Sequence, residues 1–382
     1  MNLQRKSVSK LTSMIISLVR FPLPMAVCAV HTFHKYPITA KGICYDPSQY
    51  PVTNFMLDFV EKFVADFSVP TFFFISGLLF FANGMSTDIF KNKLRHRCSS
   101  LLLPYIVWNL IAVGFAAMLY LPAFNQVLPS LAGKTFDMTW MEFFRGFTIG
   151  NAINSLPHAG TMWFIRELMT VMLLSPLISL AIDKLKWIPL VAFYLFWSIC
   201  FVGRAATYLQ FFSSALMFFS LGVYFSKCGV DPAERFTARL RPALIIFLII
   251  GITGMVFTYI GIDDILYIRL LKTVSVPCAL IVVFAIAGMY GSENGVRQKL
   301  FGNVPPFSTL LPALSFFIFM AHGIFLWHFQ LLTFAVIHPT SDLALAAAYI
   351  ASYIGILAAL TGLYLLIGKV SPRMLRILTG RS

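Results

Sequence analysis

Charged side chains are scarce in this sequence. Asp, Glu, Lys and Arg make up only 12% of its 382 residues, 59% of the residues are hydrophobic, and the mean hydropathy is +0.82. A water-soluble domain of this composition would expose far more apolar surface than folded proteins tolerate. The shortage of charge therefore excludes a soluble protein and predicts one that is embedded in a lipid bilayer.

Cysteine is also scarce, and this limits two further classes of site. The chain has six cysteines, which are scattered without the close spacing of a metal site. By the topology given below, only Cys44 lies in an outer loop, where it has no partner for a disulfide. We therefore predict no disulfide framework and no metal centre.

Acidic residues are few, since 15 Asp and Glu stand against 29 Lys and Arg, for a formal net charge of +14. The cations lie at the ends of apolar runs, so we interpret their excess as a sign of membrane topology. A nucleic-acid-binding protein would need a folded basic face with elements that read bases. We expect no nucleic-acid partner.

Long apolar runs are what the sequence contains instead. Runs near 20 residues have the length that an α-helix needs to cross a bilayer. The predicted fold class is all-α: a polytopic membrane protein with about ten transmembrane helices, in a single domain over residues 1–382. The predicted spans are 12–32, 58–83, 100–121, 160–182, 187–203, 207–226, 243–262, 270–290, 310–336 and 344–368.

The positions of Lys and Arg orient these spans. An even number of spans places both termini on one side, and most of the cations between spans fall on that side. Positive charge stays cytosolic, so we expect both termini in the cytosol with loops 84–98 and 227–241, and loop 122–159 outside. Residues 1–30 are not expected to be a cleaved signal peptide, because an arginine interrupts their apolar region.

The stretch VRFPLPMAVCAVH (residues 19–31) places Arg20 and His31 inside the first span. A charge at this depth is costly, so Arg20 is expected to face the bundle interior and meet an anion. On an ideal helix eleven residues turn about 1100° and rise about 16 Å, which places both side chains on one face; Pro22 and Pro24 are expected to bend this helix. The pair predicts an anion site toward the cytosol and a titratable base toward the outside. The alternatives are a structural ion pair or snorkelling to the interface for Arg20, and an idle interfacial position for His31.

Polar side chains in the second and fourth spans add candidates. The second span holds Asp66 in its outer half and Ser76 in its inner half, near the depth of the arginine in the first span. The fourth span opens with Trp163, an aromatic type common at membrane interfaces. Glu167 follows it and needs a partner at that depth.

The ninth span holds two histidines, His322 and His328. They are six residues apart and lie on nearly opposite helix faces. They are therefore not expected to bind one metal ion together.

Five segments, in order along the chain, carry a family resemblance. An arginine, ten residues and a histidine in the first span are followed by VPTFFFISGLLFF (69–81), KLRHRCSSLLLPYIVWN (93–109), MWFIRELMTVMLLSPLI (162–178) and SFFIFMAH (315–322). Together they resemble the membrane acyltransferase-3 family, and the resemblance covers nearly the whole chain. One position departs from the family pattern of two arginines three residues apart: Arg97 matches the first, and Ser100 stands at the second.

The resemblance implies an O-acyltransferase. Family members move an acyl group, most often acetyl, from a cytosolic coenzyme A thioester to a hydroxyl of a sugar or lipid. It implies acetyl-CoA as a donor substrate with no permanently bound cofactor, a cell-surface or membrane-linked glycan as acceptor, and a place in the bacterial inner membrane. The alternative is an exporter of a lipid-linked glycan, which would move its substrate without consuming a thioester.

The candidate residues take roles in that reaction. A hydroxyl is a poor nucleophile until a base removes its proton, and a neutral imidazole suits this task, so His31 is the expected general base. Arg20 is expected to orient the donor or to stabilise charge on the thioester carbonyl oxygen. The donor is expected to contact Arg97, Arg95 and Ser76. The acceptor or the pocket wall is expected to involve Asp66, Trp163, Glu167 and His322.

Overall fold

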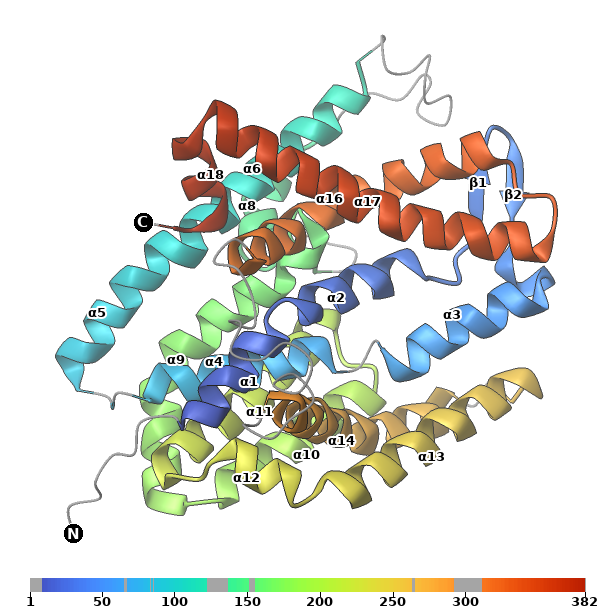
Figure 1. Ribbon diagram of the computed structural model, residues 1–382. Coiled ribbons are helices and arrows are strands. Elements are labelled where there is room, and N and C mark those ends of the chain that lie inside the picture. Colours follow the sequence, from blue (N-terminus) through green and yellow to red (C-terminus); the bar gives the residue numbers. More distant parts are fainter. Residues whose placement is uncertain are drawn as a thin grey trace.

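Helices make up nearly all of the structure, a computed structural model that describes residues 9–64, 67–82, 84, 86–121, 137–150, 155–262, 265–291 and 311–381 (Figure 1). Nine helical segments in these ranges are long and apolar enough to cross a bilayer, and the shorter apolar helix α10 (Ile188–Val202) coincides with the predicted span 187–203. The predicted all-α fold is confirmed. Within the same ranges the only strands are β1 (Ile38–Ala40) and β2 (Ile43–Tyr45), which form an antiparallel hairpin.

The other described elements follow in chain order. They are α1 (Lys10–Val19), α2 (Pro22–Thr32), the 3₁₀ turn η1 (Pro47–Gln49), α3 (Pro51–Phe63), α4 (Ser68–Phe81), α5 (Thr87–Arg97), the π-helical turn η2 (Cys98–Leu102), α6 (Leu103–Leu119), α8 (Trp140–Phe147), the 3₁₀ turn η4 (Gly160–Met162), α9 (Trp163–Leu185), α11 (Thr207–Cys228), α12 (Pro232–Thr237), α13 (Leu240–Tyr259), α14 (Ile265–Gly291), α16 (Leu311–Ile337), α17 (Asp342–Val370) and α18 (Pro372–Thr379).

The first span is a helix interrupted where α1 meets α2. Arg20 and Phe21 keep right-handed helical dihedral angles, but Pro22 has no N–H to donate to the carbonyl four residues earlier. The interruption places Arg20 at the end of α1. The sequence predicts that Arg20 and His31 lie on one face of an ideal helix. This prediction fails across the interruption, because Arg20 lines a cavity that His31 does not line.

A second irregularity joins α5 to α6. The chain forms the π-helical turn η2 just before Pro104, which has no N–H to return to the carbonyl of Ser100. π-helical turns of this kind often occur at functional sites. This turn places Arg97, the last residue of α5, and Ser100 on the wall of the same cavity.

Helices α4 and α11 touch backbone to backbone. A Cβ atom on Gly77 would lie 2.0 Å from the carbonyl oxygen of Phe219, and one on Gly222 would lie 2.1 Å from that of Phe74. Small residues permit this close packing in membrane helices. The contact holds α4, which carries Ser76, firmly in the centre of the bundle.

The helix ends separate into two sides. In Figure 1 the start of α1 and the helices α5, α12 and α18 lie at one end of the bundle, and the β1–β2 hairpin lies at the other. The predicted cytosolic loops 84–98 and 227–241 thus share one end with the start of the first span. The cytosolic identity of that end remains a prediction.

The segment after α6 differs from its predicted place. Residues 122–136 lie outside the described residues, and the following segment returns into the bundle. Tyr105, near the start of α6, donates its hydroxyl to the carbonyl of Phe147, and the buried Asn109 side chain accepts from the N–H of Ala159. The expectation that 122–159 is wholly an outer loop is therefore wrong for its last residues, which satisfy a buried amide within the bundle.

Candidate active site

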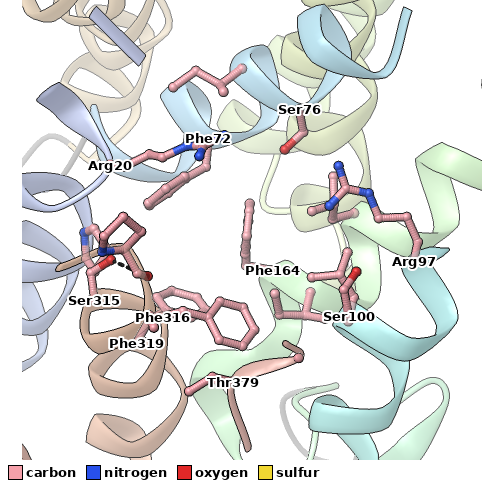
Figure 2. A pocket seen from close by; sticks show the side chains of 18 of the residues that line it. Arg20, Phe72, Ser76, Arg97, Ser100, Phe164, Ser315, Phe316, Phe319 and Thr379 are labelled. Carbon is pink, nitrogen blue, oxygen red and sulfur yellow. Dashed lines mark hydrogen bonds between the residues drawn. The ribbon is translucent and has the colours of Figure 1, made fainter. Parts of the chain in front are cut away.

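A cavity of about 340 Å³ lies in the half of the bundle that contains the start of α1 and α18. Figure 2 shows the guanidinium groups of Arg20 and Arg97 extending into it from opposite walls, with the hydroxyl of Ser76 between them. The structure therefore brings together two residues that the sequence places on separate spans, Arg20 and Ser76, and one from the loop before the third span, Arg97. Its other polar lining residues among those described are Ser100, Ser315, Thr379 and Arg381.

The lining of this cavity is cationic. It includes three arginines, and none of the described lining residues is acidic. Within the described ranges no carboxylate forms an ion pair with Arg20, so the structural ion pair considered from the sequence is not present there. A cavity of this size with several arginines and an apolar remainder is suited to a ligand that has both anionic groups and a slender apolar part.

Three phenylalanines on the cavity wall lead toward the histidines. Phe72, Phe164 and Phe319 all line the cavity, and their ring centroids lie 5.6 to 6.4 Å apart. The ring of Phe319 lies 5.9 Å from that of His322. Phe319 therefore connects the arginine-lined cavity to the histidines, since it lines the cavity and contacts His322.

Next to Phe319, His322 and His31 face each other. Their ring centroids are 5.4 Å apart, with His31 exposed near the end of α2 and His322 fully buried on α16. Nδ1 of His322 lies 3.1 Å from the carbonyl oxygen of Ile318, an acceptor, so Nδ1 carries the proton and Nε2 of the neutral ring carries the lone pair. Nε2 is buried and has no hydrogen-bond partner among the described residues.

The remaining predicted residues lie elsewhere. Arg95 is exposed on α5 and Trp163 stacks on Phe211 at 3.8 Å, and neither lines the cavity. The carboxylate of Glu167 is buried and forms an ion pair of 2.8 Å with Arg166. Asp66 lies outside the described residues.

Two further histidines are separate from the pair. His34 lies beyond the end of α2, where its Nε2 is 3.1 Å from the side-chain oxygen of Gln330. Because α2 ends at Thr32, His34 does not lie on the same helix as His31. His328 packs against Phe115 at 5.1 Å, away from His322.

Sequence reasoning missed the part of the cavity formed by the last residue of α18 and the two residues after it. Thr379, Gly380 and Arg381 line it beside Arg97, although they are nearly 300 residues away in the chain (Arg381 against Arg97). No local pattern marks these residues. The sequence held only an indirect indication: Ser100 stands where the family pattern has a second arginine, so a second cation for this wall had to come from elsewhere in the chain.

A bundle of membrane-spanning helices with an arginine-lined cavity and a nearby histidine pair defines an integral, multi-pass membrane protein with a site for an anionic ligand. A family model described as an acyltransferase domain matches residues 16–367. The chain belongs to this acyltransferase-3 family and is a membrane-bound O-acyltransferase. It is similar to the succinoglycan biosynthesis protein ExoH of Rhizobium meliloti (strain 1021), with 25% identity over 378 residues, 96% of this chain and 91% of the relative. No solved structure matches the chain.

Proposed function

We propose that this enzyme moves an acyl group, most simply acetyl, from coenzyme A to a hydroxyl of a surface polysaccharide or its lipid-linked precursor in the bacterial inner membrane. The observation that carries the proposal is that an arginine-lined cavity lies next to a histidine pair, with Phe319 lining the cavity and contacting His322. Likeness to a protein named for succinoglycan biosynthesis supports a polysaccharide acceptor.

The donor is proposed to enter the cavity from the end of the bundle with α5 and α18. Coenzyme A carries several phosphate charges, and arginines bind phosphate through paired charge-assisted hydrogen bonds. Arg97 holds a phosphate in this proposal, and Ser76 contacts the donor. Arg20 orients the thioester or stabilises the charge that develops on its carbonyl oxygen.

The acceptor hydroxyl is proposed to be activated by His31. The imidazole takes the hydroxyl proton as the oxygen attacks the thioester carbon, the carbon–sulfur bond then breaks, and the leaving thiolate regains the proton from the imidazolium. A new ester and a free thiol are the products, so atoms and charge balance.

His322 is proposed to hold His31 in the productive tautomer. A centroid distance of 5.4 Å leaves room for a water-bridged hydrogen bond between the two rings. Because Nδ1 of His322 donates to Ile318, its Nε2 can only accept, and it would accept from an N–H of His31. The other nitrogen of His31 then keeps its lone pair for the acceptor. In other enzymes a hydrogen-bonded partner likewise sets the tautomer and orientation of a catalytic histidine.

The test is acyl transfer by the purified protein in lipid vesicles supplied with acetyl-coenzyme A and a polysaccharide acceptor. We expect release of free coenzyme A in step with ester formed on the glycan. Movement of glycan across the vesicle without release of coenzyme A would favour the exporter and overturn the proposal.

A further inference from the structure

The last residue of α18 and the two residues that follow it form part of the wall of the arginine-lined cavity. Thr379, Gly380 and Arg381 all line it. A hydrogen bond fixes the backbone just before these residues: the buried indole N–H of Trp108 donates to the carbonyl of Leu378 at 3.1 Å. A fixed backbone at Leu378 means that the next three residues enter the cavity in a defined position.

Gly380 brings this segment against the wall at Ser100. Its φ is +63°, in the left-handed region that favours glycine. A Cβ atom there would lie 2.1 Å from the carbonyl oxygen of Ser100, so only glycine allows the two backbones to touch. The N–H of Arg381 donates to the carbonyl of Arg376 at 3.0 Å and closes the end of α18. Arg381 therefore begins directly beside Ser100.

Ser100 contributes little to an anion site on its own. Its side chain is small, and its hydroxyl is buried without a hydrogen-bond partner among the described residues. Arg97 lies one helical turn before it and lines the same cavity. An arginine that arrives from α18 restores a second cation on this wall.

We infer that Arg381 is a donor-binding residue, which binds a phosphate group of the coenzyme A thioester together with Arg97. The inference rests on the proposed function, because it assigns a further residue to the same donor site. A polyanion with several phosphates can occupy two guanidinium groups on one wall, each with paired hydrogen bonds. The same geometry explains how the cavity holds its donor with a serine at position 100.

The test is the binding of coenzyme A itself to the full-length protein in lipid nanodiscs, measured by calorimetry. Loss of one charge-assisted contact predicts about tenfold weaker binding for Arg381→Ala. Arg373→Ala is the matched control, because Arg373 is an exposed cation on α18 that does not line the cavity. It should bind coenzyme A like the unmodified protein. Thermal unfolding of each variant shows whether the fold is retained.

A rescue makes the test specific. Ser100→Arg in the Arg381→Ala background should recover most of the lost affinity, since position 100 lines the same wall. Gly380→Ala should weaken binding as well, because its Cβ must displace the backbone that carries Arg381.

The outcomes separate this inference from the proposed function. If Arg97→Ala weakens binding and Arg381→Ala does not, Arg381 has no role and the donor site stands. If Arg373→Ala weakens binding as much as Arg381→Ala, surface charge is responsible and the inference is wrong. If the unmodified protein binds no coenzyme A, the proposed donor is wrong and this inference falls with it.

Discussion

The arginine cavity and the histidine pair are built in contrasting ways. The cavity draws its polar groups from the end of α1, from α4, α5, the π-helical turn, α16 and the segment after α18. The pair needs only two side chains, one on α2 and one on α16. A ligand that is bound by many groups loses only part of its affinity when one of those groups is removed. A single catalytic base has no neighbour that can replace it. We therefore expect graded losses in the cavity and near-complete loss when the base itself, His31, is removed.

The largest effect is expected at His31. His31→Ala should lower the turnover rate by about 100- to 10,000-fold, because no base then takes the acceptor proton. Coenzyme A binding should be unchanged, since His31 does not line the cavity. Thioester consumption and acyl-glycan formation measured in one membrane preparation would show this.

His34 is the control for that change. It lies beyond α2 and contacts Gln330, so His34→Ala should retain most of the activity. Activity of the unmodified enzyme should fall as pH drops through the histidine pKa range, because a protonated imidazole cannot accept a proton. More than about a tenth of normal activity in His31→Ala, against the expected loss, would show that His31 is an idle interfacial residue.

Removal of Arg97 should have the next largest effect, on the donor alone. Arg97→Ala should raise the KM for the acyl donor by about 10- to 100-fold, with the loss of charge-assisted hydrogen bonds as the reason. The KM for the glycan should stay the same. Steady-state kinetics with each substrate varied in turn separates the two. A rise in the glycan KM with an unchanged donor KM would contradict the assignment.

His322 should show an intermediate loss that depends on the substituent. His322→Phe keeps the volume but removes the acceptor for His31, and we expect about a tenfold fall in kcat with the donor KM unchanged. That size corresponds to one lost hydrogen bond in the transition state. His322→Asn retains an amide oxygen that accepts, so it should recover part of the rate. Equal losses in both variants would indicate a packing role only.

The parts that the sequence could predict depend on local properties. The length and hydropathy of apolar runs are local, so nine of the ten predicted spans overlap helices that are long and apolar enough to cross a bilayer in the described part of the chain, and the tenth overlaps the shorter helix α10. The interruption near Pro22 was likewise readable from the missing N–H groups. The contacts of Arg381 with the cavity and of His322 with His31 depend on packing between distant helices. No spacing rule reports them.

The partners of Glu167 and Trp163 could not be predicted from the sequence. Glu167 and Trp163 occur in a polar segment of the fourth span and looked like pocket residues. The structure pairs the carboxylate with Arg166 and stacks the indole on Phe211. Both side chains are therefore engaged within the protein, where the sequence shows only residue types at a given depth.

The smallest effect is expected at Arg95, and it sharpens the comparison most. Arg95 and Arg97 lie two residues apart on α5 and carry the same charge, yet only Arg97 lines the cavity. Side chains two residues apart point to different sides of a helix. Arg95→Ala removes the same charge from the same end of the bundle, so any effect of the general electrostatic field on donor binding appears in both variants. An exposed cation contributes little once salt screens it, and we expect the donor KM of Arg95→Ala to stay within about twofold of normal.

The measurement is the donor KM of the two single variants, Arg95→Ala and Arg97→Ala, at low and at physiological salt. Equal increases that vanish with salt would mean that the cavity attracts its donor by net charge alone, and the graded, contact-by-contact site described above would be wrong.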